Sequence, residues 1–441
     1  MIKELNYFKE PYFDRNARQS ESVRAVPKGI IEVSGEVNVS GSKSESNRLL
    51  ILQNLFPGIK LKNLSNSDDT KYLEKALASD QELINISHAG TAMRFLTAFF
   101  STREGREVVL TGSERMQNRP IGILVDALRS LGTDISYEKK EGFPPLRIRG
   151  KKITQNEASI QGNVSSQYIS ALLLIAPSLE NGLRLKLLGE VTSVPYINMT
   201  LALLDDLGVE CGWEGNDIFV RPLDEIAPIT LTVESDWSSA SYFYSLVALS
   251  ENGEVSLSAY KQDSLQGDSS LAEIYAHFGV HTTFEHDRIR LKKISQNLYP
   301  LSLDLSNSPD LAQTIAVTCF GLGMACELTG LHTLKIKETD RLVALEKELG
   351  KLGAEISVTD KSLHLKSSES VGPHDEERSG PENKSGVKIK PGVSIDTYDD
   401  HRMAMAFAPL AIKVPIIIND AEVVTKSFTD FWRDFESVIH V

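Results

Sequence analysis

Cysteine is scarce in this chain of 441 residues. Its three cysteines, Cys211, Cys319 and Cys326, form no Cys-x-x-Cys pair and lie in apolar or turn-like sequence. The sequence therefore indicates neither a disulfide framework nor a zinc site. Such cysteine usage is typical of a reducing compartment, and we expect a cytoplasmic protein.

Long apolar runs are lacking as well. The most apolar stretch, residues 311–331, carries Gln313 and Glu327 and is interrupted by glycines, whereas a membrane span needs about 20 nearly unbroken apolar residues. We interpret this stretch as a buried helix. The first 18 residues are charged and aromatic without an apolar centre, so we expect no secretory signal.

The chain has no excess of positive charge. It contains 47 Lys and Arg against 60 Asp and Glu, a formal net charge of -13. A general attraction to nucleic acid or to an anionic membrane is therefore not expected. With 41% hydrophobic and 24% charged residues the composition is that of a soluble globular protein, and at roughly 150 residues per domain the length predicts two to four domains.

What the chain does contain is an internal repeat. Four times, a helix with apolar residues at helical spacing ends in Leu-Gly or Phe-Gly, and two short alternating strands follow. The glycines, which recur at intervals of 71 to 76 residues, are Gly132, Gly208, Gly279 and Gly353. Glycine at this place predicts a left-handed helix C-cap. Helices with polar starts lie between the copies, so the predicted order is strand, helix, strand, helix, strand, strand, in an α/β protein of about six units.

Two stretches stand outside this repeat. Residues 1–28 show no clear periodicity, and we interpret them as an N-terminal extension. Residues 367–386 are rich in Ser, Glu, Pro and Gly, which predicts a solvated, mobile loop inserted between strands. We favour a neutral insertion over a regulatory element.

The segment Gly41–Arg48 separates an alternating strand, residues 30–39, from an apolar helical run, residues 49–55. A helix start after a Gly/Ser loop leaves backbone N–H groups unpaired at the positive end of the helix dipole, which favours anion binding. Lys43 adds a full charge, Ser44 adds a hydroxyl, and Arg48 follows about one turn along the helix. The alternative is an ordinary serine-capped helix with exposed cations.

Other basic residues also stand at or near predicted helix starts. Together with Lys43 and Arg48 they are Arg94, Arg119, Lys337, Arg341, Arg402 and Lys426. In so acidic a chain this placement predicts a cleft for a ligand with several negative charges, such as phosphate and carboxylate groups. The alternative for each cation is a surface ion pair worth about 0 to 1 kcal/mol. On a helix, Lys337 and Arg341 share a face while Glu338 points elsewhere.

Six short motifs follow one another along the chain, and they are Gly41–Arg48 (GSKSESNR), Ala89–Arg94 (AGTAMR), Arg119-Pro120, Ser165-Ser166-Gln167, Lys337–Arg341 (KETDR) and Asp400–Met405 (DHRMAM). In this order they resemble the motifs of the 3-phosphoshikimate 1-carboxyvinyltransferase (EPSP synthase) family of enolpyruvyl transferases, from about residue 30 to the end. The resemblance implies a two-domain inside-out α/β barrel of six βαβαββ units, three per domain, with helix N-termini facing the interdomain cleft. It also implies that residues 40–234 form an inserted domain, and that residues 1–39 join residues 235–441 in a discontinuous one.

The implied reaction transfers the enolpyruvyl group of phosphoenolpyruvate to the 5-hydroxyl of shikimate 3-phosphate and releases phosphate through a tetrahedral intermediate, in aromatic amino acid biosynthesis. Both substrates are polyanions, which fits the clustered cations. The chemistry needs a base for the hydroxyl proton and an acid for the methylene carbon. The resemblance implies no metal or organic cofactor and no nucleic-acid or membrane partner, and we expect a monomer.

Matching motif positions imply roles for individual residues. The residues implied to bind shikimate 3-phosphate are Ser44, Arg48, Ser165, Ser166 and Ser193, with Gln167 between the two substrates. The residues implied to surround phosphoenolpyruvate are Gly90, Arg119, Arg341, Arg402 and Lys426, and Arg94 is also assigned to substrate binding. Lys43 would touch both ligands. Asp310 is the implied acceptor of the hydroxyl proton, Lys337 lies near that hydroxyl, and Glu338 is the candidate for proton exchange at the methylene carbon.

Five positions depart from the family pattern, and they are Glu45, His88, Phe95, Thr333 and Asp399. Thr333 stands where an Asn of the family contacts shikimate 3-phosphate. Glu45 replaces an aliphatic residue, and we expect it to point away from the phosphates. None of the five removes a proposed catalytic charge.

Two alternatives to this function stay open. One is the related UDP-N-acetylglucosamine enolpyruvyl transferase, which usually carries a catalytic cysteine in a mobile loop, whereas no cysteine of this chain lies near residues 116–119. The other is a non-catalytic paralogue that binds anionic metabolites. Against it stand the intact charges of Lys43, Asp310, Glu338 and Lys426.

Overall fold

A computed structural model of the protein describes residues 23–24, 32–191, 194–295, 298–367 and 389–440. Contacts along the chain divide it into two compact units. Unit 1 consists of Met1–Val39, Asp236–Gln262 and Asp268–Val441, and unit 2 of Ser40–Ser235 and Asp263–Gly267. Among the described residues, no helix has both the length and the apolar character needed to cross a membrane.

Unit 2 contains two four-stranded sheets of the same construction and a two-stranded sheet. In each larger sheet a parallel pair is extended by two antiparallel strands. One consists of β4 (Leu83–Asn85), β5 (Glu107–Thr111), β7 (Leu146–Arg149) and β6 (Asp134–Tyr137). The other consists of β8 (Glu157–Gln161), β9 (Leu183–Leu188), β11 (Asp217–Val220) and β10 (Cys211–Glu214). The third pairs β3 (Ile59–Lys62) with β12 (Ile229–Thr232) in parallel.

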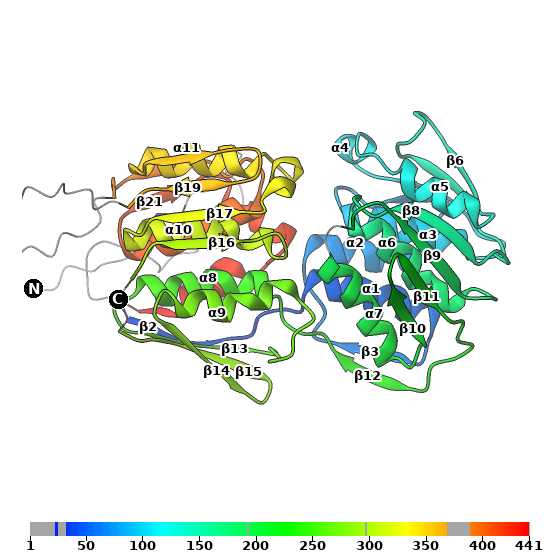
Figure 1. Ribbon diagram of the computed structural model, residues 1–441, viewed down its shortest axis with the longest axis horizontal. Coiled ribbons are helices and arrows are strands. Elements are labelled where there is room, and N and C mark those ends of the chain that lie inside the picture. The colour runs from blue at the N-terminus through cyan, green and yellow to red at the C-terminus, as the bar shows by residue number, and fades with distance from the viewer. Residues whose placement is uncertain (1–22, 25–31, 192–193, 296–297, 368–388, 441) are drawn as a thin grey trace, which may run out of the picture. The chain divides into compact units, whose positions relative to one another are not determined.

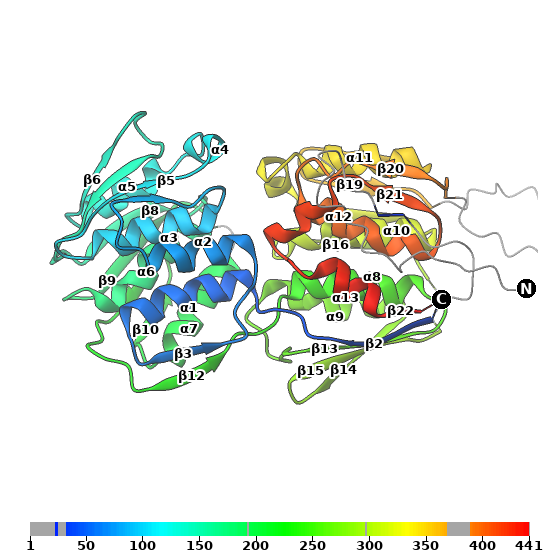
Figure 2. The same cartoon turned by 180° about the vertical axis from the view of Figure 1, so that it is seen from behind.

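Three helices of unit 2 pack against one another. They are α1 (Lys43–Leu55), α3 (Gly90–Ser101) and α6 (Ser166–Ile175). Every residue of α3 and every residue of α6 except Gln167 is buried, as expected for helices that are covered on all sides. The other helices of this unit are α2 (Asp68–Leu77), α4 (Glu114–Gln117), α5 (Gly122–Ser130) and α7 (Val194–Asp206). Figure 2 shows α2 beside α3, against which it packs.

Unit 1 contains three sheets. The largest consists of β14 (Val280–Glu285), β15 (Arg288–Lys293), β13 (Gly253–Ser258), β2 (Glu32–Val37) and β22 (Ile439–His440). The second consists of β16 (Leu301–Asp304), β17 (Cys326–Thr329), β19 (Leu363–Leu365) and β18 (Ile356–Val358), and the third of β1 (Val23–Arg24), β21 (Ile416–Ile418) and β20 (Val393–Ile395). Strand β2 pairs in parallel with β13, more than two hundred residues later in the chain.

The helices of unit 1 repeat the arrangement of unit 2. The mutually packed helices are α8 (Trp237–Leu249), α10 (Ala312–Leu322) and α12 (His401–Phe407), and Figure 2 shows α12 beside α10. The remaining helices are α9 (Leu271–Ala276), α11 (Arg341–Leu352) and α13 (Phe431–Ser437). The sheet that contains β13 runs along α8 and α9 (Figure 1). Short 3-10 helices are η1 (Ala176–Ser178), η2 (Gly267–Ser270), η3 (Pro309–Leu311), η4 (His332–Ile336), η5 (Ala408–Ile412) and η6 (Ala421–Lys426).

Among the described residues, the predicted order of elements builds a single four-stranded sheet in each of three stretches, which are residues 83–149, 157–220 and 301–365. The four repeat glycines all follow the last turn of a helix. Their φ angles are 89° for Gly132, 81° for Gly208, 74° for Gly279 and 105° for Gly353. These values confirm the predicted left-handed C-caps, a conformation that glycine adopts without a steric cost.

Residues 311–331 do not form the single buried helix predicted from their composition. Helix α10 ends at Leu322, and its C-cap Gly323 has a φ of 75°. Strand β17 follows at Cys326–Thr329. The prediction was wrong because it counted apolar residues across a glycine that reverses the backbone.

Both stretches that fall outside the repeat lie largely outside the described residues. From the predicted N-terminal extension, residues 1–28, the structure describes only Val23–Arg24, which pair antiparallel with β21. From the predicted loop, residues 367–386, it describes only Ser367.

Candidate active site

The three packed helices of unit 2 begin at residues of the predicted site. Helix α1 starts at Lys43, α3 at Gly90 and α6 at Ser166. The N-cap residues of all three make no side-chain capping hydrogen bond. The serine-capped alternative for the first loop is therefore wrong, and the N–H groups of these first turns suit an anionic ligand.

Lys43 faces a carboxylate that the sequence interpretation did not include. Its Nζ lies 3.9 Å from Asp69 Oδ2, in the first turn of α2. The side chain of Lys43 is 28% exposed and that of Asp69 is 12% exposed. The carboxylate thus holds the ammonium group while leaving part of it accessible. The only sequence signal for Asp69 is an acidic first helical turn, which is equally typical of plain helix capping.

Two guanidinium groups lie against Gly90. A Cβ atom at this position would come within 2.8 Å of Arg119 Nη1 and 3.0 Å of Arg94 Nη1. Arg94 Nη1 donates to the Gly90 carbonyl at 2.7 Å. Burial, and then the charge of Arg119, lower the pKa of Arg94. An anion bound between the two groups would offset this repulsion.

The starts of α3 and α6 are joined by Gln167, whose Nε2 donates to Thr91 Oγ1 at 3.2 Å. Ser166 beside it is buried, whereas the N-cap residue Ser165 is exposed. Ser44 is half-buried in the first turn of α1. The predicted site residue Ser193 lies outside the described residues.

Arg48 is turned into unit 2. It is 2% exposed, and burial lowers its pKa to about 10. Its donors reach Thr200 Oγ1 at 2.8 Å, Ser170 Oγ at 3.0 Å, the Tyr196 carbonyl at 3.2 Å and the Ser44 carbonyl at 2.7 Å. These bonds use four of the five N–H donors of a guanidinium group. Arg48 therefore ties α1 to α6 and α7 in this arrangement.

Glu45 is buried as well. Its Oε1 accepts a hydrogen bond from the Glu234 N–H at 3.4 Å. Its charge also acts on Arg48, where it opposes the lowering of the pKa. Glu45, which stands where the family has an aliphatic residue, is therefore hydrogen-bonded to the backbone of unit 2.

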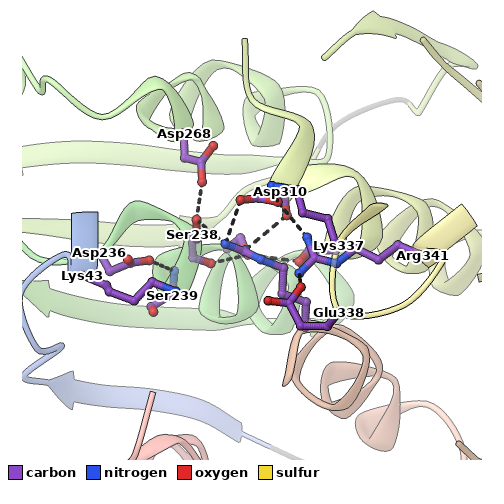
Figure 3. Close-up of polar contacts among 12 residues, drawn as sticks. Lys43, Asp236, Ser238, Ser239, Asp268, Asp310, Lys337, Glu338 and Arg341 are labelled. Atoms are coloured by element: carbon purple, nitrogen blue, oxygen red, sulfur yellow. Dashed lines mark hydrogen bonds and ion pairs between the residues drawn. The ribbon is translucent and has the colours of Figure 1, made fainter. Parts of the chain in front are cut away.

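In unit 1, three cationic side chains lie around the carboxylate of Asp310. Its Oδ1 lies 2.7 Å from Arg341 Nη1 and 3.6 Å from Lys337 Nζ, and its Oδ2 lies 3.2 Å from Arg402 Nη2. Figure 3 shows Lys337 and Arg341 on one side of Asp310. Asp310 belongs to η3, directly before α10. Three predicted cations and one predicted carboxylate, from distant parts of the sequence, thus meet at one point.

Arg341 is the first residue of α11 and is only 2% exposed. Its Nε donates to Asp400 Oδ2 at 2.7 Å, and its Nη2 donates to Glu338 Oε2 at 2.8 Å. Burial opposes the charged form, but Asp400, Asp310 and Glu338 outweigh it and raise the pKa of Arg341. The guanidinium group is therefore held ionised within unit 1.

The orientation predicted for Glu338 was wrong. We expected a helix in which Glu338 points away from Lys337 and Arg341, whereas Glu338 pairs with Arg341. The Asp340 side chain accepts from the Val343 N–H at 3.2 Å and starts α11 at Arg341. Residues 337 and 338 therefore precede the helix, where helical spacing does not apply.

Arg402 continues the network away from Asp310. Its Nη2 donates to Ser238 Oγ at 3.2 Å, and Ser238 Oγ donates to Asp268 Oδ2 (Figure 3). Burial raises the pKa of Asp268 to about 6, and Asp310 acts in the same direction while Arg402 opposes it. Sequence reasoning missed Asp268, since a lone acidic residue after a glycine is typical of any turn.

Lys426, at the end of η6, is the last predicted cation of unit 1. Its Nζ donates to the carbonyl of Asp399 at 2.7 Å and to Asp399 Oδ1 at 2.6 Å. Thr333 lies half-buried in η4, and its buried Oγ1 has no hydrogen-bond partner among the described residues.

The sequence of the chain matches the family model described as EPSP synthase (3-phosphoshikimate 1-carboxyvinyltransferase) over residues 72–435. A 3-phosphoshikimate 1-carboxyvinyltransferase of Bacteroides fragilis (strain YCH46) is 47% identical over 405 residues, which cover 91% of this chain and 95% of the relative. The chain belongs to the EPSP synthase family. Another curated relative, the 3-phosphoshikimate 1-carboxyvinyltransferase of Shewanella pealeana, is 36% identical over 443 residues, covering 93% of this chain and 98% of the relative.

Solved structures agree with this assignment at the level of the fold. The structure of EPSP synthase from Acinetobacter baumannii superposes with a TM-score of 0.77 at 20% identity, covering 96% of this chain and 99% of that one. The structure of the enolpyruvyl transferase NikO from Streptomyces tendae superposes with a TM-score of 0.69 at 14% identity, covering 96% of this chain and 99% of that one. As a member of the EPSP synthase family, the chain is a transferase with 3-phosphoshikimate 1-carboxyvinyltransferase activity in the shikimate pathway.

Proposed function

We propose that this enzyme holds shikimate 3-phosphate and phosphoenolpyruvate with the cation groups of its two units, and moves protons with Asp310 and Glu338. The enolpyruvyl group passes to the 5-hydroxyl of shikimate 3-phosphate, and phosphate leaves through a tetrahedral intermediate. The observation that carries this proposal is the Asp310 carboxylate, which Lys337, Arg341 and Arg402 surround within 2.7 to 3.6 Å.

Shikimate 3-phosphate is assigned to the helix starts of unit 2. The residues proposed to bind it are Ser44, Arg48, Ser165, Ser166 and Ser193, with Gln167 between the substrates and Thr333 at the position of a family Asn. The uncapped first turns of α1 and α6 support this assignment because their N–H groups and dipoles favour a phosphate. Lys43, at the first position of α1, would contact both substrates.

Phosphoenolpyruvate is assigned to the guanidinium groups and to Lys426. In unit 2 these are Arg94 and Arg119, with the Gly90 backbone between them. In unit 1 they are Arg341 and Arg402, both ionised despite burial. A donor that carries a phosphate and a carboxylate offers enough acceptor oxygens for several such groups.

Asp310 is proposed to accept the proton of the 5-hydroxyl, and Glu338 to exchange a proton at the methylene carbon. In the free enzyme the positive charges of Lys337, Arg341 and Arg402 compensate the negative charge of the Asp310 carboxylate. When substrate anions engage Arg341 and Arg402, the carboxylate loses part of this stabilisation and becomes a better base. Substrate binding therefore prepares the proton transfer.

We also propose that each unit is a domain built as an inside-out barrel of three βαβαββ units, and that unit 2 is inserted into unit 1. In support, the packed helices of each unit are buried while the sheets flank them. We further propose that the enzyme acts as a cytoplasmic monomer without a metal or organic cofactor.

The decisive assay is release of inorganic phosphate from phosphoenolpyruvate with different acceptors. We expect release with shikimate 3-phosphate, none with phosphoenolpyruvate alone and none with UDP-N-acetylglucosamine. Turnover restricted to the UDP-sugar would identify the other enolpyruvyl transferase. Binding of both substrates without any phosphate release would identify a non-catalytic paralogue.

Gly90→Ala is expected to weaken phosphoenolpyruvate binding without unfolding the protein. The added Cβ would displace Arg119 Nη1, which is 2.8 Å away, and Arg119 is an exposed, flexible side chain that can move. A shift of about 1 Å in a binding group costs up to about a hundred-fold in rate. We expect the KM for phosphoenolpyruvate to rise about ten-fold or more, with an unchanged melting temperature.

The matched control for this change is Gly350→Ala in α11, where an added Cβ meets no atom within 4 Å. It should leave the KM for phosphoenolpyruvate at the wild-type value. Equal KM values for Gly90→Ala and Gly350→Ala would show that Arg94 and Arg119 do not bind this substrate.

A further inference from the structure

Helix α11 carries a buried acid, Glu348, that the proposed chemistry does not use. Glu348 lies two turns after Arg341, and its side chain is 0% exposed. A buried carboxylate is costly unless hydrogen bonds satisfy it. Its Oε1 accepts from Tyr398 Oη at 2.5 Å, and its Oε2 accepts from the Asp396 N–H at 3.1 Å and from Lys351 Nζ at 2.7 Å. Glu348 thus binds the segment that follows β20 at two points, the Asp396 N–H and the Tyr398 hydroxyl.

That segment has an unfavourable backbone conformation. Tyr398 has a φ of 54° and Asp399 a φ of 57°. Two consecutive left-handed residues that bear side chains persist only where the surrounding structure holds them. Glu348 binds the N–H of Asp396 just before the pair and the hydroxyl of its first member. Lys351 adds a bond to Asp396 Oδ2 at 2.8 Å, and Asn419 adds one to Asp396 Oδ1 at 2.7 Å.

Asp399 and Asp400, at the end of this turn, contact three cations of the site. Asp399 accepts from Lys426 through its carbonyl and its Oδ1. Asp400, which is 0% exposed, binds Arg341 Nε at 2.7 Å and caps the Arg402 N–H at 2.8 Å. If the turn relaxed to ordinary negative φ angles, Asp399 and Asp400 would move and these contacts would be lost.

We propose that Glu348 is a positioning residue that holds the turn Asp396–Asp400 in its left-handed conformation, and thereby sets the positions of Lys426, Arg341 and Arg402. The proposal rests on the function proposed above, in which these cations bind phosphoenolpyruvate. Helix α11 would then have two roles. Arg341 at its start would contact the substrate, and Glu348 would hold the turn that positions Lys426 and Arg402.

The first test is Glu348→Gln. A glutamine has one acceptor oxygen in place of two and no charge. With its oxygen towards Tyr398 it loses the Asp396 bond. With its NH2 towards Tyr398 the hydroxyl must accept instead of donate, and the bond to Lys351 is no longer one between two charged groups. We expect the KM for phosphoenolpyruvate to rise about ten-fold and kcat to fall, while the KM for shikimate 3-phosphate changes less. Glu346→Gln is the matched control, since it makes the same change at a half-buried position of the same helix, and it should behave as wild type.

Tyr398→Phe provides a milder variant for the case that Glu348→Gln fails to fold. It removes one hydrogen bond to Glu348 and no charge. We expect the same rise in the KM for phosphoenolpyruvate by a smaller factor. A loss of thermal stability with an unchanged KM in both variants would reduce Glu348 to a purely structural residue and overturn the proposal.

A rescue experiment tests the role of the backbone itself. The double variants Glu348→Gln/Tyr398→Gly and Glu348→Gln/Tyr398→Ala both lack the tyrosine ring, but only glycine adopts a left-handed φ without a steric cost. We expect the glycine variant to have a KM for phosphoenolpyruvate several-fold below that of the alanine variant. Equal KM values would overturn the proposal.

Lys426→Met, measured in parallel, separates this proposal from the one on which it rests. If Lys426→Met raises the KM for phosphoenolpyruvate and Glu348→Gln does not, the substrate assignment stands and the role of Glu348 is wrong. If Lys426→Met leaves that KM unchanged, the assignment of Lys426 to phosphoenolpyruvate fails, and with it the part of the proposal in which Glu348 acts through Lys426.

Discussion

Asp310→Asn is expected to lower kcat about a thousand-fold with the fold retained. Asparagine has nearly the same shape and still offers an oxygen to Arg341, but it cannot take up the proton of the 5-hydroxyl. Arg341 keeps Asp400 and Glu338 as partners, so its ionised form stays compensated. The loss should therefore appear in kcat, measured as phosphate release, and much less in the affinity for shikimate 3-phosphate.

The control for Asp310→Asn is Asp304→Asn. Asp304 lies at the end of β16, close to Asp310 in sequence, and it bonds to the backbone and the hydroxyl of Ser306. This variant loses the same charge in unit 1 and should keep wild-type kcat. A rate near wild type for Asp310→Asn would remove Asp310 from proton transfer and reduce it to a counter-ion for the three cations.

Local patterns in the sequence were sufficient to predict much of the fold. Apolar residues at helical spacing, followed by glycine, locate the helix ends because a left-handed C-cap is set by a few neighbouring residues. The order of strands and helices follows from the same repeat. The limit of this reasoning is visible at Gly323, where one residue ends a helix inside an apolar run.

The candidate site was predictable where a charge stands at a helix start, as with Lys43, Arg341 and Arg402. Its carboxylates were harder to predict. Asp69 and Asp268 come from first turns and short turns whose acidic residues are typical of helix capping. Glu348 looks like any acid of an amphipathic helix, and only the packing of the turn after β20 against α11 makes it buried. Such contacts join segments about fifty residues apart, and no local pattern encodes them.

Arg48 shows a different limit. Its place in the motif predicts a substrate contact, which stays a prediction, but it does not predict the hydrogen bonds that the guanidinium group makes to α6 and α7. The spacing along a helix fixes the face on which a residue lies, but a long side chain selects among several acceptors on that face. Tertiary packing decides among them, and it is not visible in the sequence.

Lys43→Met is the second change with a large expected effect, and we expect kcat/KM to fall about a hundred- to a thousand-fold for both substrates. Methionine preserves the unbranched stem but removes the charge and the donors at the uncapped start of α1. A residue that touches both ligands should alter both KM values, whereas a residue of one subsite should alter one. Steady-state kinetics with each substrate varied in turn distinguishes these cases.

Three further variants define what Lys43 contributes. Lys60→Met removes the same charge from an exposed position of β3 in the same unit and should keep wild-type kinetics, which excludes a general effect of net charge. Lys43→Arg keeps the charge but changes its geometry, so an intermediate rate is expected if placement matters. Asp69→Asn removes the partner 3.9 Å from Nζ. If Asp69→Asn lowers kcat/KM far less than Lys43→Met, the charge of Lys43 acts on the substrates directly, and Asp69 serves only to hold it; equal losses would instead make the pair the functional element.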